Sequence, residues 1–263
     1  MTVKIEKAAD WLLAEREARR MFTALPGPLH PANDAEAYEV QAALCARLGA
    51  EAGPMAGAKI ALTTQVMQEM VKYFKPIAGR ILARDIHESG VTLNLTDYVR
   101  IGVECEVAVR LGRALAPEGA PYDLERVSLA VAALHVGIEL VDDRAADYKS
   151  LDAMTLIADN AFNRGVVLGP AIHDWQQLDL AAQEGVIRVN GDTRGTGRGS
   201  DVMGGHPFAA LAWLANHMAA QGLALEAGSL VMTGSLTATQ FPRAGQEVTA
   251  AIGALGEAIV KFS

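Results

Sequence analysis

The spacing of apolar side chains divides the sequence into two parts. Within residues 1–56, apolar positions recur every three or four residues, which is typical of one face of a helix. One such segment runs from Trp11 to Phe22 and ends at a Pro/Gly-rich turn over residues 25–28, and a second spans residues 35–48. We therefore predict a helical N-terminal region over residues 1–56.

From residue 57 onward the pattern changes to short β-rich runs with a few helices between them. Helices are predicted at 63–73, 124–134 and 206–221, and Asn190-Gly191 predicts a hairpin because both residues tolerate positive φ. Irregularly placed strands with few crossover helices favour an α+β fold with a mixed, mainly β domain over residues 57–263, not a doubly wound sheet. The predicted strands are 92–95, 101–111, 138–142, 164–168, 186–189, 230–233 and 247–252.

The composition is that of a folded, acidic protein. Hydrophobic residues make up 51% of the chain and charged residues 21%, and 23 Lys and Arg against 31 Asp and Glu give a net charge of −8. Such a chain does not belong to the disordered class. Without a cluster of basic residues, it is also a poor partner for nucleic acid or for an anionic membrane.

Two cysteines, Cys45 and Cys105, cannot build a disulfide framework, and CxxC metal spacings are missing. The charged start of the chain lacks the apolar stretch of a signal peptide. The longest apolar run, 127–141, is interrupted by His135 and Glu139 and is shorter than the ~20 residues of a bilayer span. We expect a cytoplasmic protein with no membrane partner.

A glycine-rich stretch, GDTRGTGRGSD, superficially resembles a phosphate-binding loop. Its Gly195, Gly197 and Gly199 have the spacing GxGxG instead of GxGxxG, and the stretch does not open directly onto a helix. We interpret it as the second strand of the hairpin at Asn190-Gly191.

The segment 101–110 carries the first chemical signal. As a strand, it points Val103 and Cys105 to one face and Glu104 and Glu106 to the other. Cys105 is then a small core residue instead of a nucleophile. Two carboxylates side by side in an apolar strand need compensation, which a divalent cation bound by oxygen ligands would supply. The alternative is the exposed face of an edge strand, where both glutamates are solvated.

Two further polar residues lie in apolar surroundings. Glu139 follows His135 by four residues, which suits a metal pair on a helix, but Gly137 and the alternation around it suit a strand equally well. Lys59 lies in a largely uncharged segment, with an ordinary surface lysine as the alternative. Three acids, a divalent cation and a buried lysine would suit enolate chemistry on a 2-oxo acid.

These residues belong to five segments that occur in a fixed order along the chain. They are GAKIALTTQVMQ (57–68), VECEVAVRLG (103–112), IELVDDR (138–144), IADNA (157–161) and TGSLT (233–237). Together they resemble the 2-keto-4-pentenoate hydratase family, which belongs to the fumarylacetoacetate hydrolase superfamily. The resemblance extends from about Trp11 to Phe262.

The resemblance implies a mixed β-sandwich roll around a barrel-like core, preceded by helices, and assembly into homo-oligomers. It implies Mg²⁺ or Mn²⁺ as cofactor and a small 2-oxo acid as substrate. The residues that match the family's site are Glu104, Glu106 and Glu139 as metal ligands, Lys59 as the active-site lysine, and Asp159, Asn160, Gly234 and Ser235 as substrate-binding residues.

The activity that the resemblance implies is hydration of a 2-hydroxy-2,4-dienoate, or of its 2-oxo tautomer, to a 4-hydroxy-2-oxo acid in aromatic-compound catabolism. A 2-oxo-3-enedioate decarboxylase is the first alternative, since both reactions pass through the same enolate. A noncatalytic scaffold of the same fold is the second, although a scaffold has no reason to keep the lysine and all three acids together.

Several positions depart from the pattern of the hydratases. Ile77 stands where hydratases of this family often have an aspartate, which resembles the decarboxylase branch, and Ala78 stands where an aromatic ring is usual. Arg198 and Asp201 occupy positions in the glycine-rich segment where small residues are usual. These departures leave the substrate's side chain open.

Overall fold

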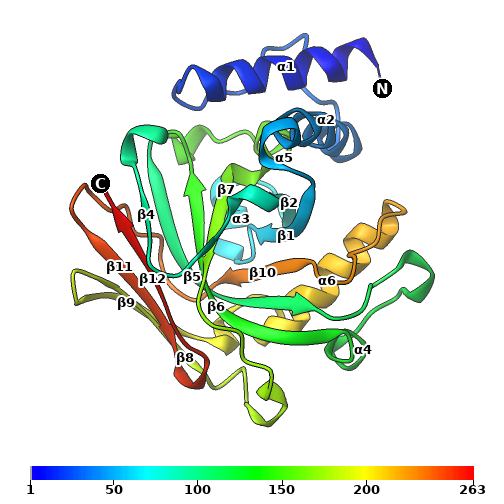
Figure 1. Ribbon diagram of the computed structural model, residues 1–263. Coiled ribbons are helices and arrows are strands. Elements are labelled where there is room, and N and C mark those ends of the chain that lie inside the picture. Colours follow the sequence, from blue (N-terminus) through cyan, green and yellow to red (C-terminus); the bar gives the residue numbers. More distant parts are fainter. Residues whose placement is uncertain (1) are drawn as a thin grey trace.

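The computed structural model describes residues 2–263. Its first two helices, α1 (Val3–Glu17) and α2 (Asp34–Ala52), lie side by side outside the sheets (Figure 1). Each begins at a side-chain cap, because Thr2 accepts a hydrogen bond from the Ile5 amide and Asn33 accepts one from the Glu36 amide. The two predicted N-terminal helices are confirmed, although α1 ends before Phe22. The boundary between residues 56 and 57 as a division into domains stays a prediction.

Two mixed sheets form the body of the protein. The seven-stranded sheet has the order β2-β1-β10-β5-β6-β7-β3, and the five-stranded sheet has the order β4-β12-β11-β8-β9. Parallel pairs (β1 with β10, β3 with β7, β12 with β4) occur beside antiparallel ones, which confirms the α+β fold with mixed sheets. The strands are β1 (Met55–Ala61), β2 (Ile77–Leu82), β3 (Ile86–Glu88), β4 (Val91–Leu93), β5 (Ile101–Leu111), β6 (Val131–Asp142), β7 (Asn163–Leu168), β8 (Glu184–Val189), β9 (Asp192–Arg198), β10 (Leu230–Ser235), β11 (Glu247–Ile252) and β12 (Gly256–Phe262).

The main core joins the two sheets. Val103 and Cys105 of β5, Ile187 of β8 and Val248 of β11 belong to one buried cluster. Cys105 is fully buried there, as expected for a small core residue. Because β5 lies between β10 and β6, its opposite face is not that of an edge strand, and the solvated-edge interpretation of its glutamates is wrong.

Four further helices complete the chain: α3 (Gln65–Val71), α4 (Leu124–Ser128), α5 (Ala153–Ala158) and α6 (Pro207–Ala220). The helix predicted at 206–221 is confirmed as α6, with Pro207 in its first turn and His206 as its cap. The helix predicted at 124–134 is wrong beyond residue 128, because residues 131–134 belong to β6 and pair with β5. Pairing along a long buried neighbour outweighs the weak local preference for helix.

The hairpin between β8 and β9 is confirmed, with φ of 51° at Asn190 and 85° at Gly191. The glycine-rich stretch is strand β9, not a phosphate loop. A Cβ atom at Gly197 would lie 1.8 Å from the carbonyl oxygen of Leu236, so glycine is required where β9 crosses the segment after β10. Within residues 2–263, no helix combines the length and the hydropathy needed to cross a bilayer.

Candidate active site

Three glutamates come together at the centre of the seven-stranded sheet. The register of β5 and β6 places Glu104 directly opposite Glu139, and Glu106 follows two residues later on the same face. One carboxylate oxygen from each of the three lies within 4.8 Å of the others. Glu106 and Glu139 are buried, and Glu104 is half-buried. Strand pairing thus holds all three side chains in one cluster.

The end of β10 and the segment that follows it contribute hydrogen bonds to this cluster. The Gly234 amide donates to Glu106 Oε2 at 2.8 Å, and the Thr239 hydroxyl donates to Glu104 Oε1. Gly234 has a φ of +104°, which glycine adopts without strain. The backbone of Gly234, near the end of β10, therefore orients the carboxylate of Glu106.

The electrostatics of the cluster favour a bound cation. Burial, reinforced by the charge of Glu139, raises the pKa of Glu104 to about 7 and the pKa of Glu106 well above its ordinary value. Glu106 Oε1 is buried and has no hydrogen-bond partner among the described residues. A buried oxygen without a partner and three oxygen donors in reach of one point fit a hard divalent cation.

Lys59 reaches this cluster from β1. It is 3% exposed, and its Nζ lies 2.9 Å from Glu139 Oε1, so the surface-lysine interpretation is wrong. A Cβ atom at Gly79, its partner on β2, would lie 3.2 Å from Lys59 Cγ, and glycine leaves room for the lysine side chain. Burial alone would lower the pKa of Lys59, but Glu139 and Glu104 outweigh it and raise that pKa. The amine is therefore protonated.

His135, the other candidate ligand of a helical pair with Glu139, lies in β6. Its Nδ1 is 2.8 Å from the carbonyl oxygen of Gly169. The strand interpretation of this segment is therefore confirmed, and the helical metal pair is wrong.

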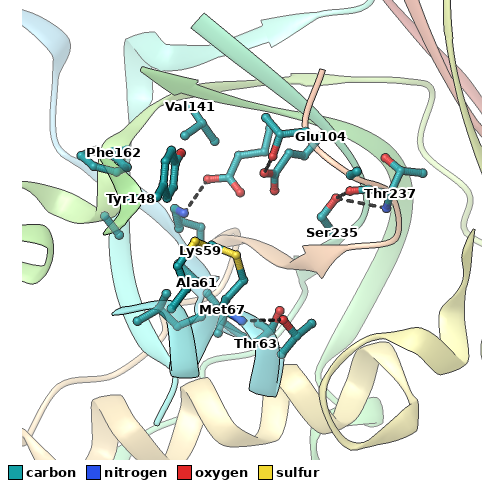
Figure 2. Close-up of a pocket in the computed structure, with 18 of the residues that line it drawn as sticks. Lys59, Ala61, Thr63, Met67, Glu104, Val141, Tyr148, Phe162, Ser235 and Thr237 are labelled. Atoms are coloured by element: carbon teal, nitrogen blue, oxygen red, sulfur yellow. Dashed lines mark hydrogen bonds and ion pairs between the residues drawn. The ribbon is translucent and has the colours of Figure 1, made fainter. Parts of the chain in front are cut away.

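A cavity of about 690 Å³ opens onto Lys59, Glu104 and Glu139. Its two sides differ in character, as Figure 2 shows. Glu104, Ser235 and Thr237 lie on one side of Lys59, whereas Tyr148 and Phe162 lie on the other. The cavity therefore has a polar side beside the carboxylates and an apolar side beyond the lysine.

The predicted substrate-binding residues separate into two groups. Ser235 lines the cavity, and Gly234 contacts Glu106 through its amide. Asp159 is fully buried and forms ion pairs of 2.7 Å with Arg16 and with Arg144, and neither it nor Asn160 lines the cavity.

The side chain of Asn160 hydrogen-bonds both the amide and the carbonyl of Arg80, which ties it to β2. The next two residues, Ala161 and Phe162, face the cavity instead. Direct contact of Asp159 and Asn160 with a substrate stays a prediction from the resemblance.

Several cavity residues carry no motif that sequence reasoning could use. Thr239 holds Glu104, and Tyr148 lines the apolar side while donating its hydroxyl to Asp143 at 3.0 Å. Met67 and Met70 of α3 also line the cavity. Met67 belongs to the family segment 57–68, whereas only the helical spacing of α3 offered a signal for Met70.

The departures from the hydratase pattern occupy two different places. Ile77 and Ala78 are buried at the start of β2, outside the cavity lining, whereas Asp201 lines the cavity and accepts a hydrogen bond from the Arg198 amide. Only Asp201 among these departures can affect a ligand directly.

Residues 65–263, which include all three glutamates, match the family described as fumarylacetoacetate (FAA) hydrolase C-terminal. The chain belongs to the fumarylacetoacetate hydrolase family. It is 30% identical over 266 aligned residues to a 2-hydroxyhexa-2,4-dienoate hydratase of Comamonas testosteroni, covering 97% of this chain and 99% of the relative.

A second relative of this fumarylacetoacetate hydrolase family member carries a different activity. The chain is 33% identical to a 4-oxalocrotonate decarboxylase of a Pseudomonas species, covering 84% of each protein. The fold also matches the 4-oxalocrotonate decarboxylase from Pseudomonas putida G7 in complex with magnesium and adipate. The TM-score is 0.91 at 24% identity, covering 100% of this chain and 99% of that one.

Proposed function

We propose that the protein is a divalent-metal-dependent hydratase, which adds water to a 2-hydroxy-2,4-dienoate and releases a 4-hydroxy-2-oxo acid. One observation carries this proposal: Glu104, Glu106 and Glu139 converge beside Lys59, and Lys59, Glu104 and Glu139 line one cavity. The hydratase relative, which aligns over nearly the whole length of both proteins, supports the same reaction.

The three glutamates would hold the cation, and oxygen donors alone favour Mg²⁺ or Mn²⁺ over zinc. A cation held there would act as a Lewis acid and stabilise negative charge that develops on the 2-oxo group of a substrate. Ser235 and Thr237 on the polar side of the cavity would bind the same end of the substrate. We therefore expect the acidic head of the substrate on this side.

Lys59 is suited to move protons. Its protonated amine can position the substrate and deliver a proton to C5 of the dienoate, and the neutral amine can then take up the 2-hydroxyl proton, which gives a 2-oxo-3-enoate. Water then adds at C4 and a proton adds at C3, so the product is the 4-hydroxy-2-oxo acid. The raised pKa of Lys59 disfavours a Schiff base, which needs a neutral amine.

Decarboxylation of a 2-oxo-3-enedioate is the second candidate. The same residues would stabilise the same enolate, formed by loss of CO₂ instead of a proton. Ile77 in place of the hydratases' aspartate and the 33% identity to a decarboxylase favour it. A scaffold without catalysis is disfavoured, because the buried acids and Lys59 are clustered at a cavity.

Four finer points complete the proposal. The protein would act in the breakdown of aromatic compounds, lie in the cytoplasm, use Mg²⁺ or Mn²⁺, and assemble as a homo-oligomer. The pathway, the metal and the oligomer follow from the family resemblance, and the compartment follows from the expectation drawn from the sequence.

The decisive experiment assays the purified, metal-stripped protein with 2-hydroxypenta-2,4-dienoate and with 2-oxohex-3-enedioate, with and without Mg²⁺ or Mn²⁺. Metal-dependent formation of 4-hydroxy-2-oxopentanoate supports hydration, and release of CO₂ from the dioate supports the second candidate. No turnover of either substrate with metal present would refute both.

A pair of variants links the activity to the cluster. Glu106→Gln removes a buried candidate ligand, and we expect it to abolish both metal binding and turnover. Glu257→Gln, at an exposed position of strand β12, is the matched control and should keep both. Wild-type metal affinity in Glu106→Gln would overturn the ligand assignment.

A further inference from the structure

The apolar side of the cavity is a built surface, continuous with a hydrophobic core. Leu62, Val141, Leu151, Leu156 and Phe162 line the cavity and belong to one buried hydrophobic cluster. Their neighbours in that cluster hold them in place, so this wall is pre-formed. A ligand that reaches past Lys59 therefore meets hydrocarbon.

Among the described residues that line the cavity, no free basic side chain could pair with a second carboxylate of the substrate. Lys59 is the one basic residue among the described residues that line it, and its amine already pairs with Glu139. Asp201 adds a further carboxylate to the lining. A far carboxylate that lies against the apolar wall would lose its water without gaining a cation, and such a buried unpaired charge is strongly unfavourable.

The volume of the cavity exceeds what the smallest dienoate needs. A five-carbon hydroxydienoate has about eight non-hydrogen atoms, whereas sites of ~300–1,000 Å³ hold drug-sized ligands. The cavity of about 690 Å³ lies within that range. Space therefore remains beyond the reacting carbons, and the apolar wall surrounds it.

The helix α3 forms the adaptable part of this wall. Met67 and Met70 line the cavity, and Met70 is 36% exposed where the helix meets solvent. Unbranched methionine side chains fill gaps of varying shape. Val66, 72% exposed on the same helix, does not line the cavity.

We propose that the site selects monocarboxylates: 2-hydroxy-2,4-dienoates that carry an uncharged, apolar tail beyond C5. The tail lies against the apolar wall, and Met67 and Met70 determine its length. This inference rests on the proposed hydration for the identity of the head group, and it excludes dioates as preferred substrates.

The test compares substrates that differ only at the far end. With Mg²⁺ present, kcat/KM should rise about fourfold for each methylene added to the tail, until the wall is covered. The kcat/KM of a 1,7-dioate of matched chain length should be at least ~100-fold lower than that of the monoacid. A flat or falling series, or a dioate used as well as the monoacid, would overturn the inference.

A binding experiment separates this inference from the reaction. Calorimetry on the Mg²⁺-loaded protein compares saturated 2-oxo acids of increasing length with 2-oxoheptanedioate. Affinity that increases with tail length and a weak dioate support the inference even if no dienoate is hydrated, in which case only the proposed function fails. Hydration of pentadienoate without any dependence on the tail refutes the inference alone.

A pair of lysine variants of α3, one in the apolar wall and one outside the cavity, tests the assignment of the wall. Met70→Lys gives a far carboxylate a cation, and we expect the ratio of dioate to monoacid kcat/KM to rise about tenfold. Val66→Lys places the same charge on the same helix outside the cavity and should leave the ratio within about twofold of wild type. Equal ratios in both variants, with unchanged circular dichroism, would contradict the assignment of the wall.

Discussion

Replacement of Glu104 by glutamine separates the contribution of the carboxylate to metal binding from its effect on the metal-free fold. The pKa of Glu104 is raised from 4.5 to about 7 by burial and by Glu139. A raised carboxyl pKa means that the folded protein favours the neutral form. The stability linked to Glu104 is therefore fully present below about pH 4.5 and is lost as the pH rises to about 7.

The magnitude follows from the shift. A change from 4.5 to about 7 corresponds to about 3 kcal/mol at about 1.4 kcal/mol per unit. Because Glu104 is only half-buried beside the cavity, screening reduces this to about 1–2 kcal/mol. Glutamine keeps the shape of the side chain and still accepts the hydrogen bond from Thr239. Glu104→Gln should therefore stabilise the metal-free protein at about pH 8 and leave it unchanged near pH 4.5.

Urea unfolding of the EDTA-treated proteins at several pH values measures this difference in free energy. When the experiment is repeated with Mg²⁺ or Mn²⁺, the free energy of unfolding of wild type should increase in proportion to the logarithm of the metal concentration. The free energy of unfolding of Glu104→Gln should not change with metal. Glu257→Gln on the exposed surface is the control and should follow wild type in both series. A variant that is less stable than wild type without metal at about pH 8, or that keeps the metal response, would refute the reasoning.

Three further predictions test other parts of the site. Lys59→Ala should keep metal affinity but lower kcat at least ~100-fold, because the proton carrier is lost; near-normal kcat would remove the lysine from the mechanism. Metal affinity measured by calorimetry should fall about tenfold for each pH unit below about 7, because protons compete for Glu104, and a constant affinity from about pH 5.5 to 8 would contradict this. Asp159→Asn should destabilise the fold by about 3–5 kcal/mol in urea, since Arg16 and buried Arg144 lose their anion. If that loss is below about 1 kcal/mol while KM increases, Asp159 binds substrate instead.

Much of the local structure could be predicted from the sequence because it depends on neighbouring residues. Asn190-Gly191 specifies its turn through the φ angles that these residues tolerate, and His206-Pro207 starts α6. The alternation around Cys105 correctly separated the core face of β5 from the face of the glutamates. These features rest on backbone geometry within a few residues.

Where local preference and long-range pairing compete, the sequence alone was insufficient. Residues 131–134 have a helical pattern but extend β6, because the whole length of β5 pairs with that strand. The short strands β1 and β2 around the lysine segment were missed for a similar reason. β1 pairs with β2 and with β10, and β10 lies far from β1 in the sequence, so no local pattern marks this pairing.

The sequence by itself determined which residues could carry chemistry: acids and a lysine in apolar segments, where ionised side chains require partners. Only the tertiary structure decided that Glu104 faces Glu139 across a strand pair, and that Lys59 reaches Glu139 through the space left by Gly79. It also decided that Asp159 pairs with arginines and that the apolar wall forms from α3, α5 and β6. Distances between segments far apart in sequence depend on strand register and packing, which arise only when the whole chain folds.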